Sequence, residues 1–323
     1  VTPLERNRVS LNFDISEGEV AKIRQIHFVG NKVFKDKDLA SEFVLSTPGF
    51  LTWYSKNDQY SKPKLQGDLE NLRSFYLNQG YLEFTIDSTQ VSITPDKRDI
   101  FITVNLTEGK NYRVAEIKLA GDLIVPEAEL RKMIKLAPGD VFSRERLTET
   151  TKLIQDRLGN EGYAFASINP VPEINREKDE VTFTLYIDPG RRVYVRRIGI
   201  FGNTNTRDEV VRREMRQLES GWYNTAKLNR SKQRVDKLGY FSEVQVDTPA
   251  VQGTTDQVDV EVKLTERATG NITAGIGFST AEKIILSAGV SQNNIFGTGN
   301  ALAFQLSTGS VNQVYSLSYT DPY

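Results

Sequence analysis

IRQIHFVG at Ile23–Gly30 decides the fold of this chain, because similar stretches follow it: VAEIKLAG at Val114–Gly121 and VRRIGIFG at Val195–Gly202. Each stretch is a strand-like run that ends at a glycine. A second glycine marker recurs at the same two spacings, at Gly18, Gly109 and Gly190. Two markers with equal spacings indicate an internal repeat in the first part of the chain.

Each repeat is predicted to contain a strand, two helices and two further strands, as the third repeat shows. Thr206–Glu209 (TRDE) has the form of a capping box, which predicts the start of the first helix. Leu228 and Val235 recur at helical spacing in a second helix that stops at Gly239. Strict alternation in Val258–Leu264 predicts the last strand. Units of this length can each bury a core, so we expect a string of small α+β modules.

The markers divide the chain into five segments. They are residues 1–20, the end of a preceding repeat; 21–109, 110–191 and 192–267, the first, second and third complete modules; and 268–323, a C-terminal segment of different character. Because Leu11, Phe13 and Ile15 alternate like a last strand, we expect the chain to begin inside a repeat. The linkers Lys110–Asn111 and Arg191–Arg192 are short, so we expect little bending between neighbouring modules.

The charge pattern changes abruptly after Arg267. The chain has 41 Lys and Arg and 42 Asp and Glu residues, yet only Glu282, Lys283 and Asp321 are charged beyond Arg267. Apolar residues alternate there with glycine and small polar residues in four runs: Ile272–Phe278, Ile284–Val290, Leu302–Leu306 and Tyr315–Tyr319. The pattern is typical of transmembrane β-strands. One sheet of a soluble sandwich shows the same alternation and stays open as an alternative.

Composition excludes several classes of function. A net charge of −1 and a pI of about 6.1 give no global attraction to nucleic acid, so we expect no nucleic-acid partner. The chain has no cysteine and a single histidine, His27. One histidine cannot form a cluster of histidines that binds a metal, and it does not make a convincing catalytic triad. We therefore predict no metal, no cofactor and no enzymatic activity.

Five sequence motifs indicate which protein family the chain resembles. They are RREMRQLESG (Arg212–Gly221), KLGYFSEV (Lys237–Val244), GNITAGIGFST (Gly270–Thr280), NNIFGTGN (Asn293–Asn300) and YTDPY (Tyr319–Tyr323). With the repeats, they resemble tandem POTRA modules followed by a bacterial outer-membrane barrel, over essentially the whole chain. The resemblance implies an α+β fold of β-α-α-β-β modules that leads into the first antiparallel strands of a transmembrane β-barrel. The complete modules would correspond to POTRA modules 3–5 of the family's assembly subunit.

The resemblance also implies a function. Such proteins fold barrel proteins and insert them into the outer membrane of Gram-negative bacteria without ATP, and their POTRA modules lie in the periplasm. The implied partners are accessory outer-membrane lipoproteins, unfolded outer-membrane protein clients and the lipid bilayer. A related translocation subunit and a non-catalytic periplasmic scaffold are the alternatives. A two-partner secretion transporter, which has only two modules, fits poorly.

The penultimate strand of the first module is a candidate for pairing with a partner strand. Glu83–Thr94 is long and free of proline, whereas its counterpart in the second module contains Pro170 and Pro172. Its apolar residues change from even positions (Phe84, Ile86) to odd positions (Val91, Ile93). This change predicts a β-bulge near Asp87–Gln90. The candidate pairing residues are Phe84, Ile86, Asp87, Ser88, Thr89, Gln90, Val91 and Ile93. A bulged edge that only prevents aggregation is the alternative.

A helix predicted over Asp208–Glu219 would expose charges on one face. These are Arg212, Arg213, Arg216 and Glu219. The resemblance places this module next to the membrane, which makes the face a candidate docking site for an accessory lipoprotein. A mixed-charge helix face is otherwise simply solvated, so that alternative stays open.

The first strand after Arg267 is, by the same resemblance, one side of a lateral seam in the barrel. Its residues are Asn271, Ile272, Thr273, Ala274, Gly275, Ile276, Gly277 and Phe278. Only a few residues separate it from the last strand of the third module, Val258–Leu264. We therefore expect the position of the third module to be coupled to this strand.

Overall fold

The computed structural model describes residues 2–4, 8–10, 21–49 and 56–322. By backbone contacts the chain divides into two compact units: residues 1–118, 134–150 and 171–184 in one, and 119–133, 151–170 and 185–323 in the other. A short antiparallel pair, β1 (Thr2–Leu4) and β2 (Arg8–Ser10), precedes the first module. The strand predicted around Leu11, Phe13 and Ile15 lies outside the described residues.

Each module contains a three-stranded sheet with its last strand in the centre. The strand orders are β3-β5-β4, β6-β8-β7 and β9-β11-β10. The bounds are β3 (Lys22–Val29), β4 (Thr85–Ile93), β5 (Asp99–Thr107), β6 (Arg113–Gly121), β7 (Ser167–Asn175), β8 (Glu180–Asp188), β9 (Tyr194–Phe201), β10 (Phe241–Asp247) and β11 (Gln257–Glu266). In the first and third modules the central strand runs parallel to the first strand and antiparallel to the penultimate one. The penultimate strand is therefore an edge, as predicted.

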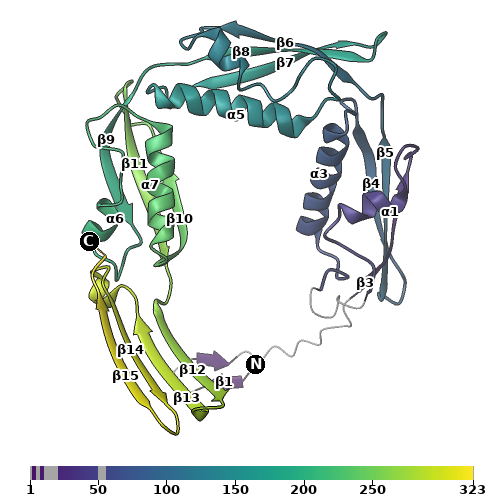
Figure 1. The fold of residues 1–323 in the computed structure, drawn as a ribbon. Helices are drawn as coiled ribbons and strands as arrows, with labels where there is room; N and C mark the ends of the chain where they lie inside the picture. The colour runs from purple at the N-terminus through teal and green to yellow at the C-terminus, as the bar shows by residue number, and fades with distance from the viewer. Residues whose placement is uncertain (1, 5–7, 11–20, 50–55, 323) are drawn as a thin grey trace. The chain divides into compact units, whose positions relative to one another are not determined.

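Among the described residues, each module also has a short helix and a long helix. The short ones are α1 (Asp36–Ser41), α4 (Glu127–Arg131) and α6 (Asp208–Arg212), and the long ones are α3 (Lys62–Asn78), α5 (Arg144–Asn160) and α7 (Thr225–Lys237). In α7, the Asn224 side chain accepts a hydrogen bond from the Lys227 N–H and caps the first turn. The helix ends as predicted, because Gly239 takes a positive φ of 72° just after it. In Figure 1, α7 lies against the sheet of its module.

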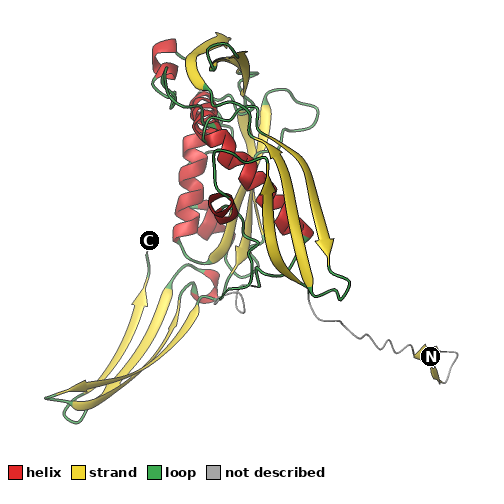
Figure 2. Ribbon diagram, turned by 90° about the vertical axis from the view of Figure 1, so that its right-hand side faces the viewer, coloured by secondary structure: helices red, strands yellow, loops and turns green. Residues whose placement is uncertain are grey.

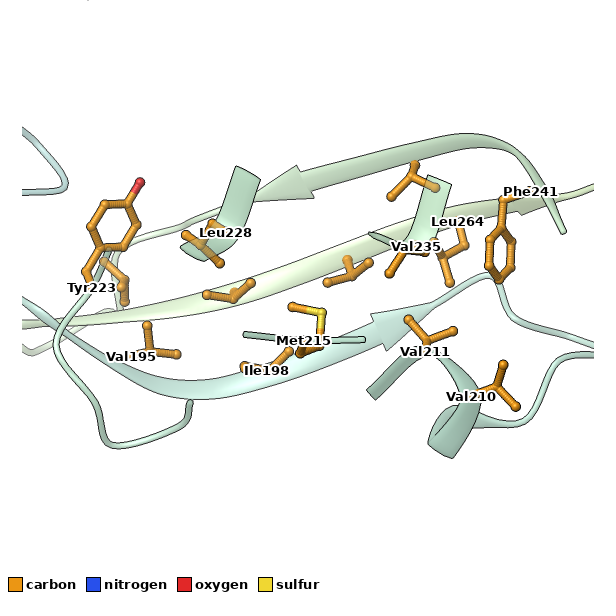
Figure 3. Close-up of a cluster of buried hydrophobic side chains, with 14 of the residues drawn as sticks. Val195, Ile198, Val210, Val211, Met215, Tyr223, Leu228, Val235, Phe241 and Leu264 are labelled. Atoms are coloured by element: carbon orange, nitrogen blue, oxygen red, sulfur yellow. The ribbon is translucent and has the colours of Figure 1, made fainter. Parts of the chain in front are cut away.

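The core of the third module lies between its sheet and its helices (Figure 3). The central strand β11 buries every second residue, namely Val258, Val260, Val262 and Leu264, as the alternation predicted. Leu228 and Val235 from α7 pack against them, together with Val210 and Val211 from α6. Burying each such side chain stabilises the module by roughly 1.5–3 kcal/mol, so one core holds both layers together.

The glycine after each first strand is required by close backbone contact. Gly30, Gly121 and Gly202 have φ of 101°, 94° and 85°. A Cβ at these positions would lie 2.0–2.2 Å from the carbonyl oxygen of a residue in the central strand: Leu106, Ile187 or Leu264. Any side chain would overlap that oxygen and strain the backbone. This contact explains why the glycine marker recurs in the sequence.

The segment after Arg267 forms one antiparallel sheet in the order β12-β13-β14-β15 (Figure 2). Its strands are β12 (Gly270–Ser279), β13 (Lys283–Gln292), β14 (Ala301–Thr308) and β15 (Gln313–Thr320), and they match the four predicted runs. A 3-10 turn, η1 (Ile295–Gly297), joins β13 and β14. No helix among the described residues is long and apolar enough to span a membrane.

The helix predicted over Asp208–Glu219 is wrong in length. Helix α6 ends at Arg212, and the chain then turns, with Ser220 at a positive φ of 59°. The capping box is also wrong, because the N-cap residue is Arg207 and makes no side-chain cap. Beyond the helix, Gln217 is buried, and its side-chain amide donates to the carbonyl groups of Leu218 and Trp222 within the turn.

Candidate functional site: edge strands and the module–sheet junction

Strand β4 offers a backbone edge for pairing. Within the described part of the chain it pairs only with β5. The register shifts between Ile86 and Ser88, which confirms the predicted bulge and places it at Asp87. The Asp87 carboxylate accepts hydrogen bonds from the hydroxyls of Thr85 and Thr107, at 3.0 and 2.7 Å, and so stabilises the bulge.

The bulge brings the predicted apolar residues of β4 to one face. Ile86, Thr89, Val91 and Ile93 each pair with a β5 residue that belongs to the core. Yet Val91 is 39% exposed and Ile93 54% exposed. The free edge is therefore flanked by apolar side chains that a second strand could cover.

The other candidate residues of this edge differ in their surroundings. Asp87, Ser88 and Gln90 are exposed on the strand. Phe84 precedes the strand and is buried, and its ring stacks on Tyr76 with 4.1 Å between ring centroids. Phe84 therefore belongs to the core of the first module rather than to the pairing surface.

The four candidate docking residues of the third module do not form one helix face. Arg212 donates to the Asp208 carboxylate at 2.8 Å and to the Ile198 carbonyl group at 3.3 Å. Glu219 accepts a hydrogen bond from the Ile198 N–H at 2.8 Å and forms an ion pair with Arg212 at 3.5 Å. Both side chains thus hold the backbone of β9.

The remaining two docking candidates lie beyond the end of α6. Arg213 is half-buried, and Arg216 is exposed. The backbone N–H of Arg216 donates to the Ser231 hydroxyl at 2.7 Å, which ties the turn to α7. Of the four charges, Arg216 is therefore the one best placed to meet a partner.

Strand β12 carries all eight candidate seam residues, and all eight are exposed. It pairs with β13 without a register shift, from Gly270 opposite Gln292 to Ser279 opposite Lys283. No other described strand pairs with β12, so its outer edge keeps free N–H and C=O groups. Ile272, Ile276 and Phe278 lie on one face, each at least 77% exposed. A free edge beside an uncovered apolar face can accept a further strand.

The turn between β13 and β14 contacts the third module, a feature that the sequence did not predict. The Arg207 N–H donates to the Gly297 carbonyl group at 3.0 Å. The Asn294 side-chain amide donates to the Thr206 hydroxyl at 2.8 Å, and the Tyr240 hydroxyl donates to the Gly299 carbonyl group at 3.0 Å. Together these bonds fix the turn on the third module.

The backbone of this turn takes conformations that L side chains rarely adopt. Asn294 and Phe296 have φ of 61° and 51°, and Gly297 has φ of 72°. A Cβ on Gly297 would lie 1.9 Å from the Asn205 carbonyl oxygen. Phe296 is 85% exposed, so its ring does not explain the strained backbone. The close contact between the turn and the module does.

Glu266 organises the module side of the junction. Its carboxylate accepts hydrogen bonds from the Thr204 hydroxyl at 2.8 Å and from the backbone N–H groups of Asn205 and Thr206 at 2.9 and 2.7 Å. Burial opposes ionisation of this carboxyl, but the hydrogen bonds outweigh it and lower its pKa to about 2. The loop that receives the turn is thus held by a charged group that stays ionised.

An open cleft of about 790 Å³ lies at the junction. Thr204 and Glu266 line it from the module, and Gly270, Gln292 and Phe296 line it from the sheet. Within the described ranges no group of three or more histidine or acidic residues could hold a metal ion. The chemistry that the arrangement offers is backbone pairing at free strand edges, in a sheet whose β13–β14 turn is fixed to the third module.

The fold defines a class of protein in which small β-α-α-β-β modules precede an antiparallel sheet. A family model described as POTRA, "Surface antigen variable number repeat", matches residues 21–109, 112–190 and 193–267. The chain therefore belongs to the POTRA family.

Comparison with curated proteins shows which members of this class are similar to the chain in sequence. The chain is 43% identical, over its whole length, to "Outer membrane protein assembly factor BamA" of Neisseria meningitidis, of which it covers 41%. It is 29% identical over 99% of its length to the protein of the same name from Buchnera aphidicola, of which it covers 52%. The chain thus spans about two fifths to one half of these relatives.

Solved structures agree with the curated relatives. The crystal structure of Haemophilus influenzae BamA POTRA3-5 matches 77% of this chain and 97% of its own, at 30% identity and a TM-score of 0.69. The structure of BamA from Haemophilus ducreyi lacking POTRA domains 1-3 matches 66% of this chain and 40% of its own, at 34% identity and a TM-score of 0.59. These matches confirm the predicted fold class and the predicted resemblance to outer membrane protein assembly factors. They also confirm an outer-membrane location with POTRA modules in the periplasm.

Proposed function

We propose that the chain acts in the folding of β-barrel proteins and their insertion into the bacterial outer membrane. The match to outer membrane protein assembly factors along its whole length supports this role. One structural observation carries the mechanism: among the described strands β12 has a free outer edge, and the β13–β14 turn of the same sheet is fixed to the third module. An unfolded client contributes a strand to that edge, and β12 forms one side of a lateral seam.

The modules recruit partners by a related principle. The free edge of β4 accepts a strand or extended segment of a client or of an accessory outer-membrane lipoprotein. Its length, the lack of proline and the exposed Val91 and Ile93 support this assignment. On the third module, Arg216 and the adjoining turn are the docking candidate for a lipoprotein. The ties of Arg212 and Glu219 to β9 mean that reversing either charge would also disturb the module itself.

Client folding in proteoliposomes tests the proposal. The N–H groups of neighbouring strand residues point to opposite edges, so Ala274→Pro and Gly275→Pro remove one N–H that faces β13 and one that faces outward. We expect the outward-facing proline to slow the appearance of folded, protease-resistant client while β12 and β13 stay paired. Normal folding rates with that variant would show that the edge of β12 is not used. If the chain is instead a periplasmic scaffold, neither the two variants nor the parent protein should promote client folding.

A further inference from the structure

The joints between neighbouring modules share one hydrogen bond that involves a helix of each module. Asn78 is the last residue of α3, and its side-chain oxygen accepts from the Glu145 N–H at 2.9 Å. Asn160 is the last residue of α5, and its side-chain oxygen accepts from the Ala226 N–H at 2.8 Å. In both joints the donor is the second residue of the next long helix, α5 or α7. The same contact is therefore built twice.

This contact is a helix cap supplied by the preceding module. The first N–H groups of a helix have no partner within it and need an outside acceptor. In α7, the module's own Asn224 serves the Lys227 N–H, and in α5 Ser143 lies 3.4 Å from the Arg146 N. Asn78 and Asn160 serve the N–H one position earlier in each helix. Both positions of the first turn have an acceptor from the protein only when the neighbouring module is in place.

The linkers add matching ties at both joints. Asn111 donates its side-chain amide to the Gln79 carbonyl group at 2.5 Å, and Arg192 donates from Nε to the Glu161 carbonyl group at 2.7 Å. One residue earlier, Lys110 reaches Asp179 and Arg191 reaches Thr255, each in the hairpin turn of the following module. Exposed ion pairs contribute little, whereas a cap between neutral groups is not weakened by salt. The asparagine cap is thus the tie that links the long helix of one module to the long helix of the next at both joints.

The third module supplies an internal comparison. Asn78 and Asn160 lie two residues before Gly80 and Gly162, and the corresponding residue before Gly239 is Lys237. A lysine side chain has no acceptor, so it cannot cap a helix N-terminus. The linker tie persists there, since Arg267 donates from Nε to the Gly239 carbonyl group at 2.7 Å. The asparagine is therefore present in the first and second modules, which are followed by another module with a long helix. It is replaced by Lys237 in the third module, which is followed by the β12–β15 sheet.

We propose that Asn78 and Asn160 are positioning residues that set the orientation of neighbouring modules by capping the long helix of the next module. The inference goes beyond barrel assembly, because it concerns the geometry in which the modules present their edges. It also gives a physical cause for the limited bending that we expect at the two short linkers.

Spin-label distance measurements on the full chain test the proposal, and the lack of native cysteine makes labelling specific. Gln66→Cys with Lys152→Cys spans the first joint, and Lys152→Cys with Gln233→Cys spans the second; all three positions are exposed. We expect Asn78→Ala to broaden only the first distance distribution and Asn160→Ala only the second. The N–H groups of Glu145 and Ala226 should exchange with solvent about tenfold faster in the respective variants.

Matched variants separate capping from a general structural role. Asn78→Asp and Asn160→Asp keep the acceptor and should retain the parental distributions and exchange rates. Asn229→Ala removes an exposed asparagine of α7 and should change nothing. Circular dichroism should show equal helix content in all variants. Parental distributions in both alanine variants, or equal broadening in the aspartate variants, would overturn the proposal.

Discussion

At the scale of single residues, the junction replaces local hydrogen bonding with contacts between distant parts of the chain. The Thr206 hydroxyl was expected to cap α6, but it accepts from Asn294, 88 residues away in the sequence. Glu266 provides the acceptors that the loop before α6 needs. A local pattern such as TRDE cannot reveal this competition, because the winning partner comes from another part of the chain.

Gly297→Ala should release the turn from the third module. Its Cβ would overlap the Asn205 carbonyl oxygen in addition to straining a positive φ, so we expect a loss of about 2–3 kcal/mol in the stability of the docked turn. Faster hydrogen exchange of the Arg207 N–H, which donates to Gly297, would report the release. Gly253→Ala is the control, because Gly253 has a φ of 84° and nothing within 4 Å. Equal effects of the two substitutions would contradict a role for the close contact.

Stability at the junction should depend on the charge of Glu266. Its pKa is lowered from 4.5 to about 2, so its contribution is fully present above pH 4.5 and is lost as the pH falls towards 2. We expect Glu266→Gln to lower the free energy of unfolding of the third module by about 1–2 kcal/mol at pH 7, after solvent screening. The difference from the parent should shrink as the pH falls from 4.5 towards 2 and vanish below pH 2.

Chemical denaturation of both proteins between pH 2 and pH 7 measures this dependence. Glu243→Gln is the matched control, since Glu243 is exposed in β10 and the described structure gives its carboxylate no hydrogen bond. A Glu266→Gln penalty that is the same at pH 2 and pH 7 would show that the carboxylate's charge is not the cause.

At the scale of elements, periodicity predicted strands better than short helices. Side chains alternate between the two faces of a sheet, so alternating apolar residues predicted the central strands and the four strands after Arg267. A change in that alternation predicted the bulge in β4. Helix α6 has only five residues, and Met215 continues the apolar spacing beyond its end. That spacing reflects burial in a turn, so it predicted a helix that is too long.

Proline substitutions in β4 test edge pairing. Ser88 and Val91 both follow the bulge and are three residues apart, so their N–H groups point to opposite edges. The proline whose position faces β5 should destabilise the first module by about 3 kcal/mol. The other should leave unfolding unchanged and reduce the amount of accessory lipoprotein or client that co-purifies with the protein.

Alanine at the same two positions provides the control for loss of the side chain. Binding that is unchanged in the stable proline variant would refute the role of β4 as a pairing edge and leave the bulge as a device against aggregation.

At the scale of the whole molecule, the repeats and the change of charge at Arg267 predicted the order of the parts. The fold class follows from features that recur along the chain, such as the glycine that contacts each central strand. The junction and the caps at the joints could not be predicted, because they depend on which residues meet across module boundaries. The markers for them, Asn78, Asn160 and Asn294, are single asparagines that look like ordinary turn or helix-end residues.

The central claim is that a client strand pairs with the free edge of β12. Disulfide cross-linking tests it most directly, because the chain has no cysteine of its own. Single cysteines at Thr273, Ala274, Gly275 and Ile276 are combined with single cysteines along one strand of a barrel client arrested during assembly. The account predicts cross-links in one antiparallel register, which shifts by one client residue for each step along β12. Cross-links without a register, or none above the level of a cysteine in β14, would contradict it.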